Sequence, residues 1–142
     1  MRQTRTGQER GASNYFNAVM LKDDLYSVRK IKEENKSIEV IIELNEQHKI
    51  FEGHFPGQPV LPGVCIMQMT REILESFLNK KLQLLKADDI RFSSMVNPTK
   101  NKELKFILQY NFNQMPQINM SAKILNKEDV VCCKIKATYK II

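Results

Sequence analysis

The chain is poor in the residues that build disulfide frameworks and membrane spans. Its 142 residues include only three cysteines. Cys132 and Cys133 are neighbours, and neighbouring strand residues point to opposite faces of a sheet, so these two thiols are not expected to pair. We therefore expect no disulfide framework and a reducing, cytoplasmic location. No apolar run approaches the roughly 20 residues that a membrane-spanning helix needs.

Metal, nucleotide and nucleic-acid sites also lack their usual signatures. The two histidines, His48 and His54, are six positions apart, a spacing typical of neither helical nor cysteine-paired metal sites. No glycine-rich phosphate-binding motif follows a strand. The net charge of +6 suits an acidic partner, but aromatic residues do not interleave with the basic ones. We therefore expect no metal, no nucleic acid, and a surface turn position for His48.

The composition is that of one ordinary globular domain. Hydrophobic residues make up 42% of the chain, enough for a core without metal or disulfides. Residues 1–19 are polar and lack periodicity, so we predict a flexible or atypical N-terminal extension there. A single domain is predicted over residues 20–142.

Alternating apolar residues predict a largely antiparallel sheet. The segment 36–44, for example, places Ile38, Val40, Ile42 and Leu44 on one face. Further strands are predicted over 25–31, 88–94, 103–112 (with Leu104 to Phe112 inward at every second position), 117–125 and 130–141, and a helix over 64–78. These elements predict an α+β fold, with about five to six strands around one long, mostly buried helix. The exposed sheet edge predicts a homodimer or larger assembly.

The densest cluster of glycine and proline precedes the helix, in "FEGHFPGQPVLPGVCIMQMTREILESF" (residues 51–77). This stretch holds three of the five glycines and three of the five prolines. Such residues favour one particular loop shape. His54 begins the loop, and an imidazole suits proton transfer near neutral pH. The helix start at Gly63 offers backbone N–H groups that can polarise a carbonyl oxygen.

The segment "GHFPGQPVLPGV" resembles the signature of the FabZ-type 3-hydroxyacyl-acyl-carrier-protein dehydratases of the hot-dog superfamily. The resemblance covers about residues 21–142. It implies dehydration of a 3-hydroxyacyl thioester, carried on the phosphopantetheine of acyl carrier protein, to the trans-2-enoyl thioester, with no further cofactor. It also implies active sites shared between subunits of a homodimer or a trimer of dimers.

The same resemblance implies roles for individual residues. His54 would remove the proton alpha to the thioester, and the N–H of Gly63, alone or with that of Val64, would polarise the thioester carbonyl. The helix acid of the family lies fourteen positions after the histidine, where this chain has Gln68. Substrate-binding roles are expected for Phe55, Pro62, Val64, Met67 and Phe92. Carrier docking is expected among Lys80, Lys81, Lys86, Arg91, Lys100, Lys102 and Lys105.

Gln68 leaves three interpretations open, because an amide cannot readily donate a proton to a leaving hydroxyl. The enzyme can still dehydrate if His54 carries the proton and Gln68 holds the hydroxyl. A neighbouring acid, Glu72 or Glu75, can substitute, although both are interpreted first as surface charges; a carboxylate there would also suit hot-dog thioesterase chemistry. Finally, the chain can be a non-catalytic subunit that pairs with an active dehydratase or binds the carrier.

Overall fold

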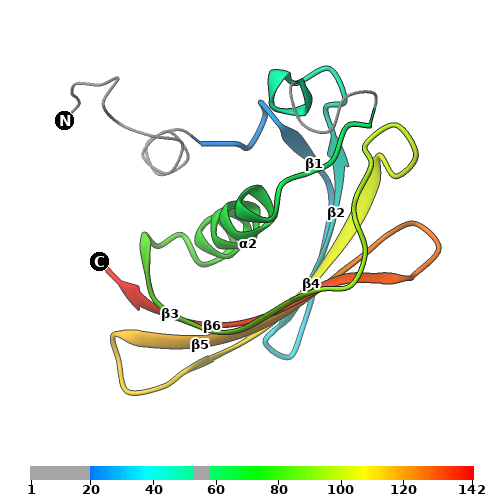
Figure 1. The fold of residues 1–142 in the computed structure, drawn as a ribbon. Helices are drawn as coiled ribbons and strands as arrows, with labels where there is room; N and C mark the ends of the chain where they lie inside the picture. The colour runs from blue at the N-terminus through cyan, green and yellow to red at the C-terminus, as the bar shows by residue number, and fades with distance from the viewer. Residues whose placement is uncertain (1–19, 53–57) are drawn as a thin grey trace, which may run out of the picture.

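The chain folds into a curved antiparallel sheet that wraps around the long helix α2 (Figure 1). This computed structural model describes residues 20–52 and 58–142. The elements in chain order are β1 (Tyr26–Glu34), β2 (Ser37–Leu44), the short 3-10 helix η1 (Lys49–Phe51), α2 (Gly63–Leu78), β3 (Leu82–Phe92), β4 (Glu103–Phe112), β5 (Gln117–Leu125) and β6 (Val131–Ile141). The predicted α+β class is confirmed.

The sheet has six strands in the order β1-β2-β4-β5-β6-β3, and each neighbouring pair is antiparallel. The connection through α2 carries the chain across the sheet, so β3 pairs with the C-terminal strand β6 and not with β2. β1 and β3 are therefore the two edges. Residues of β3 are exposed at nearly every position, which leaves this edge and both of its faces uncovered in the single chain.

Most predicted strand faces are confirmed by the burial of their side chains. In β2, Ile38, Val40, Ile42 and Leu44 are all buried against the core, as the alternation predicts. Helix α2 packs on the same face of the sheet, and its buried apolar residues are Cys65, Ile66, Met69, Ile73 and Leu74. The core is therefore the layer between α2 and the concave face of the sheet (Figure 1).

The inward position predicted for Phe112 at the end of β4 is wrong. Its side chain is 45% exposed, although the preceding inward residues of β4 are buried. Tyr110 contacts the ring of Phe77, near the end of α2. Phe112 lies two positions further along the strand and contacts Tyr110 edge-on. The apolar alternation therefore continues past the part of the strand that the helix covers.

Strand β3 begins six residues earlier than the predicted strand over 88–94. The segment from Leu82 pairs with β6, but the register shifts twice, between Leu84 and Lys86 and again between Ala87 and Asp89. Each irregularity reverses the face on which the following side chains lie. No alternation of apolar and polar residues can therefore run through this segment. For this reason the sequence pattern did not predict the first part of β3.

Cys132 and Cys133 are both buried, although strand geometry would place neighbours on opposite faces. The register between β5 and β6 shifts here, because Ile124 pairs with Cys133 while Leu125 pairs with Val131. Cys132 is the extra residue at this irregularity. All three cysteines are free thiols. Burial raises the pKa of Cys65 to about 12 and contributes most to raising that of Cys133 to about 11, so both stay protonated near neutral pH.

His48 is not the surface turn residue that the sequence predicts. It is only 7% exposed and caps η1, with Nδ1 accepting a hydrogen bond from the backbone N–H of Ile50 at 2.9 Å. Because Nδ1 is the acceptor, Nε2 carries the proton and donates to Asp24 at 2.9 Å. His48 therefore connects η1 to the segment before β1.

Candidate active site

The first turn of α2 presents backbone donors that the described residues do not satisfy. Pro62 is the N-cap, with extended backbone angles and no side-chain cap, and the first turn contains no acidic residue. The N–H groups of Cys65 and Ile66 donate to the carbonyl of Pro62. Within residues 20–52 and 58–142, those of Gly63 and Val64 have no acceptor. This positive end of the helix dipole can therefore polarise a carbonyl oxygen.

A pocket of about 590 Å³ opens beside this helix terminus. Its lining residues come from the segment before α2, the first turns of α2 and the segment after β3: Val60, Leu61, Pro62, Gly63, Ile66, Phe92, Ser93, Ser94, Met95 and Val96. The N–H of Leu61 donates to the carbonyl of Val96 at 2.8 Å, which holds the two segments together. The lining is largely apolar, as a binding site for an acyl chain requires.

Gly63 is the residue that lets Phe92 approach the helix start. A Cβ atom added at Gly63 would lie 2.7 Å from Cζ of the Phe92 ring, closer than real Cβ atoms come to any neighbour. The Phe92 side chain is 53% exposed, so its ring also forms the outer wall of the pocket. Glycine at position 63 therefore serves a close approach between helix and strand.

The structure brings three of the predicted site residues together and separates others. Pro62, Gly63 and Phe92 line the pocket. Val64 is 50% exposed on the first turn, and Met67 is partly buried against the core. Neither lines the pocket. His54 and Phe55 lie outside the described residues, so their predicted roles stay predictions.

Gln68 is buried and donates from Nε2 to the Oε2 atom of Glu72 at 2.8 Å. Glu72 was expected to be a surface charge, and this expectation is wrong, because its side chain is only 1% exposed. Glu75 is partly buried, and its Oε2 accepts a hydrogen bond from the backbone N–H of Leu82 at 2.8 Å. Glu75 therefore connects the helix to the start of β3.

Three further donors surround the Glu72 carboxylate, and all come from the segment before or at the start of β1. The backbone N–H of Leu21 donates to Oε2 at 2.8 Å, and that of Lys22 donates to Oε1 at 3.0 Å. The hydroxyl of Tyr26 donates to Oε1 at 2.9 Å. Burial, followed by the charge of Glu72, raises the pKa of Tyr26, so its hydroxyl keeps the proton that it donates.

The sequence contained only a partial signal for this network. The spacing of Gln68 and Glu72 places both on one face of the helix. Nothing local indicated that the segment containing Leu21 and Lys22 would cover that face, since those contacts span about fifty positions of the chain.

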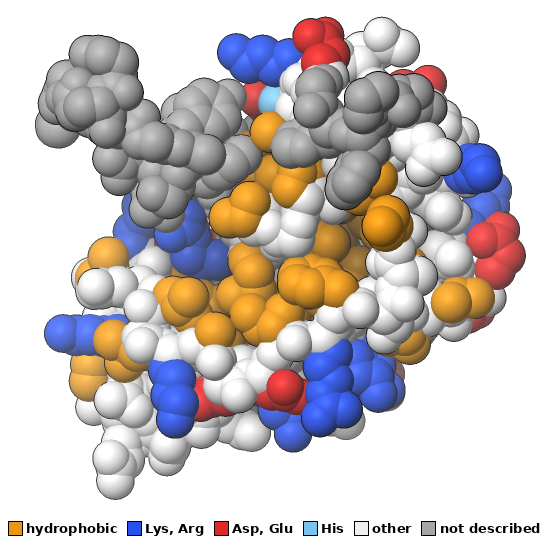
Figure 2. Space-filling model, viewed as in Figure 1, with side chains coloured by type: hydrophobic (Ala, Val, Ile, Leu, Met, Phe, Trp, Pro, Cys, Tyr) orange, Lys and Arg blue, Asp and Glu red, His pale blue; other side chains and the backbone are white. Residues whose placement is uncertain are grey.

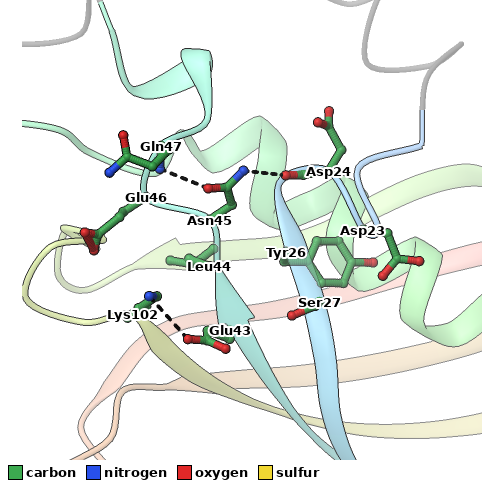
Figure 3. A pocket seen from close by; sticks show the side chains of 10 residues that line it. All are labelled: Asp23, Asp24, Tyr26, Ser27, Glu43, Leu44, Asn45, Glu46, Gln47 and Lys102. Carbon is green, nitrogen blue, oxygen red and sulfur yellow. Dashed lines mark hydrogen bonds and ion pairs between the residues drawn. The ribbon is translucent and has the colours of Figure 1, made fainter.

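A second pocket, of about 450 Å³, lies where β1 begins and β2 ends (Figure 3). Its polar groups largely bind one another: Asn45 donates to the carbonyl of Asp24, and the Lys102 ammonium lies 3.3 Å from Glu43. It shares no lining residue with the pocket at Gly63. No cluster of metal-binding side chains occurs in the described part of the chain.

The face around α2 is the most apolar part of the surface in Figure 2, where hydrophobic side chains gather over the helix above a border of Lys and Arg. The exposed large hydrophobic residues near the helix start and along β3 are Val64, Leu84, Leu85, Phe92 and Met95. Among the described helices, none is long and apolar enough to cross a membrane.

Comparison with known proteins places this architecture in a family. The profile of the ApeI-like family, described as ApeI dehydratase, matches residues 30–135. The 3-hydroxyacyl-[acyl-carrier-protein] dehydratase FabZ of Lactobacillus helveticus is 29% identical over 105 residues, which cover 69% of this chain and 68% of that protein. FabZ of Syntrophobacter fumaroxidans is 30% identical over 89 residues, covering 57% and 59%.

Solved structures share the fold at low sequence identity. The dehydratase heterocomplex ApeI:P from Xenorhabdus doucetiae matches with a TM-score of 0.60 at 16% identity, over 80% of this chain and 96% of that one. A hypothetical thioesterase from Streptococcus pneumoniae matches with a TM-score of 0.59 at 13% identity, over 86% and 94%. The six-stranded sheet around one helix is thus the predicted hot-dog fold, and the chain belongs to the ApeI-like dehydratase family.

Proposed function

We propose that the protein dehydrates 3-hydroxyacyl thioesters, carried on acyl carrier protein, to trans-2-enoyl thioesters in fatty acid or related lipid synthesis. The observation that carries this proposal is the juxtaposition of two N–H groups, those of Gly63 and Val64, with an apolar pocket walled by Phe92; neither N–H has an acceptor among the residues that the structure describes. A thioester carbonyl can accept from the helix start while its acyl chain enters the pocket. Membership of a dehydratase family supports the same reaction.

The proposed reaction moves one proton and expels one water. His54 removes a proton from the carbon next to the thioester carbonyl, and the N–H groups at Gly63 stabilise the charge that develops on the carbonyl oxygen. The electron pair of the broken C–H bond forms the new double bond. The C–O bond at carbon 3 breaks, and the departing hydroxyl takes the proton from His54. Gln68 holds that hydroxyl in place.

Purified protein incubated with a 3-hydroxyacyl-acyl-carrier thioester should form the enoyl thioester, detected by mass spectrometry as a loss of one water. His54→Ala should lower turnover by about 10²- to 10⁴-fold, because it removes the proton-transferring group. Free acid in place of enoyl product would contradict the proposal and indicate a thioesterase. An intact substrate with the carrier still bound would indicate a non-catalytic subunit.

The non-catalytic alternative is favoured by one observation, the amide of Gln68 at the position where an acid is expected. The dehydratase of Xenorhabdus doucetiae that shares this fold is a heterocomplex. A chain of this kind could bind the carrier while a second dehydratase-like subunit completes the chemistry. Measuring enoyl thioester by mass spectrometry with and without such a partner distinguishes an active dehydratase from a non-catalytic subunit.

For the protein acting alone, we propose a homodimer formed through β3. This edge strand is exposed at nearly every position, and Phe92 at its end walls the pocket, so a second copy would cover β3 and complete the site. Leu85→Lys should raise the dimer dissociation constant at least about 10-fold by placing a charge in a buried interface. Sedimentation analysis measures the change.

The matched control is Ile31→Lys, because Ile31 is a similarly exposed aliphatic residue on β1, the other edge of the sheet. It should leave the dimer unchanged. If the Ile31→Lys dimer dissociated while the Leu85→Lys dimer stayed intact, the interface would instead lie at β1.

We propose no cofactor beyond the phosphopantetheine arm of the carrier. Carrier proteins of this pathway are acidic, and several of the predicted docking residues stand near carboxylates of the chain itself. The ammonium of Lys86 lies 3.6 Å from Asp88, and the guanidinium of Arg91 lies 3.1 Å from Asp89. These pairs are exposed and weak, so both cations can still attract an acidic partner. The free thiols support the predicted cytoplasmic location.

A further inference from the structure

The convex face of the sheet, which lies on the side away from α2 (Figure 1), carries a compact group of four cations. Lys123 of β5 is exposed between two buried neighbours, so its side chain faces away from the core. Lys134 and Lys136 of β6 are exposed between buried neighbours in the same way. Arg91 of β3 follows Ile90, which packs against the core, and therefore also faces outward.

The four cations are neighbours across three adjacent strands. The register places Lys123 directly opposite Lys134, and Lys134 directly opposite Arg91. The Cβ atoms of residues that face each other in this way are about 5 Å apart. Like charges at directly opposite positions destabilise a sheet. An anion bound over these side chains would relieve their repulsion.

The chain does not neutralise the three lysines of this group itself. Within residues 20–52 and 58–142, no carboxylate forms an ion pair with the ammonium of any of them. Lys105, which faces outward on β4, differs in this respect, because its ammonium lies 3.4 Å from Asp129 and 3.9 Å from Glu39. The positive charge on β5 and β6 therefore remains available to a ligand.

The same four cations line a groove of about 420 Å³, which we call the convex groove. Among the described residues that line it, Asp89 is the one carboxylate, and it lies 3.1 Å from the Arg91 guanidinium. This pair is exposed and weak, so the cations outweigh the single acid. Gln109 and Ser121 add polar hydrogens to the lining. The convex groove shares no lining residue with the pocket at Gly63.

The extent of the positive charge indicates the size of the ligand. In the row that contains Lys123, the next positions are Ile107 on β4 and Glu39 on β2. In the row that contains Lys136, the next two positions are neutral. A nucleic-acid strand or an anionic membrane surface would require positive charge that continues across the face. Here the charge spans three strands, or roughly 10 Å, which suits a small molecule.

We propose that the convex groove binds a small soluble anion that carries two or more phosphate groups. Lysine binds phosphate oxygens as a point charge, and arginine can bind them through two parallel hydrogen bonds. A single phosphate group reaches only part of a cluster of this width, whereas two linked groups can contact Lys123, Lys134 and Arg91 together. This site is separate from the proposed dehydration and does not depend on it.

The test is calorimetric titration of the full-length protein with inorganic pyrophosphate at a constant ionic strength of about 0.15 M. We expect saturable binding to one site per chain, at least about 10-fold tighter than the binding of inorganic orthophosphate, which has fewer contacts. Lys134→Gln removes the central cation and should raise the Kd of pyrophosphate at least about 10-fold, because a charge-assisted hydrogen bond contributes on this scale.

The matched control is Lys140→Gln. Lys140 is an exposed lysine on the same strand and the same face as Lys134, but it lies outside the convex groove. Its substitution removes the same charge and should change the Kd of pyrophosphate by less than about 2-fold, because a distant surface charge is screened by salt.

Thermal denaturation gives a second measurement. Pyrophosphate at ten times its Kd should raise the Tm of the wild type by roughly 3–6 °C. Without the anion, Lys134→Gln should be at least as stable as the wild type, because two contacts between like charges are removed. The same pyrophosphate concentration should then give less than half of the wild-type increase in Tm.

Absence of saturable pyrophosphate binding would overturn the proposal, as would equal losses of affinity in Lys134→Gln and Lys140→Gln. Two further controls use vesicles of phosphatidylglycerol and the acidic carrier protein. If either of them bound in a way that Lys134→Gln weakened while pyrophosphate did not bind, the convex groove would be a docking surface for a membrane or a protein and not a site for a small anion.

Discussion

Replacing Gln68 with glutamate should make the stability of the protein strongly dependent on pH. The substitution places a second carboxylate beside Glu72, at a site where Nε2 of Gln68 now lies 2.8 Å from Oε2 of Glu72. Two unit charges about 4 Å apart repel by about 4 kcal/mol at an effective dielectric constant near 20. The pair will therefore share one proton, and its pKa will rise above the value of about 4.3 that glutamate has in an unfolded chain.

The sign of the effect follows from this raised pKa. The folded Gln68→Glu protein keeps its extra proton to a higher pH than the unfolded chain does, so stability is retained at low pH and is lost as pH rises through the folded-state value. Between pH 5.5 and pH 8.5 we expect the free energy of unfolding to fall by roughly 2–4 kcal/mol relative to the wild type. Urea denaturation at the two pH values measures this difference.

The control is the double substitution Gln68→Glu with Glu72→Gln, which exchanges the acid and the amide. It keeps one carboxylate and one hydrogen bond between the two positions, so it should show almost none of the pH-dependent loss. If the single substitution behaved like the double one, the side chains at 68 and 72 would not be in contact in solution.

The sequence predicted the fold well wherever a single pattern ran through an element. The buried faces of β2 and β5 follow a strict alternation, and each strand pairs without interruption on at least one side. The helix that begins at Gly63 was marked by Pro62 and by its apolar first turns. In these segments local preference and tertiary burial agree, so the pattern was sufficient.

Prediction failed where contacts between distant segments decide the structure. β3 was partly missed because two irregularities in its pairing with β6 break the alternation. His48 was placed on the surface because its partner, Asp24, lies in another segment. Glu72 was read as a surface charge because its donors, Leu21, Lys22 and Tyr26, lie some fifty positions earlier. A charged residue on a helix is ordinarily solvated, and only the folded chain shows that this one is covered.

The same distinction applies to the candidate site. The Gly/Pro-rich segment before the helix predicted Gly63 as a site residue, because the first N–H groups of a helix have no intrahelical acceptor. This part of the prediction needs only local structure. The pocket wall formed by Phe92 requires β3 to end opposite that helix start. The resemblance to the dehydratase family implied this tertiary arrangement, but the periodicity of the sequence could not predict it. The close contact between Gly63 and Phe92 connects the locally determined helix start to the pocket wall that depends on tertiary structure, and this contact can be tested directly.

Gly63→Ala should lower kcat/KM by about 100-fold while leaving the fold intact. The added Cβ would lie 2.7 Å from Cζ of Phe92, whereas ordinary contact begins at 3.4 Å, so the ring must move by several tenths of an ångström. Phe92 is 53% exposed and can swing outward at little cost in stability. The displaced ring no longer walls the pocket, and misplacement of a substrate by about 1 Å can cost about 10²-fold in rate.

Phe92→Ala provides the control, because it removes the atoms that the new methyl group would meet. On its own it should weaken substrate binding through the lost apolar wall. In its presence, Gly63→Ala should cost less than about 3-fold further, so the two effects are far from additive. Steady-state kinetics of the four proteins in the cycle give the coupling. Full additivity would mean that alanine at position 63 acts on the backbone N–H of the helix start and not through the ring, which would separate the oxyanion donor from the acyl pocket.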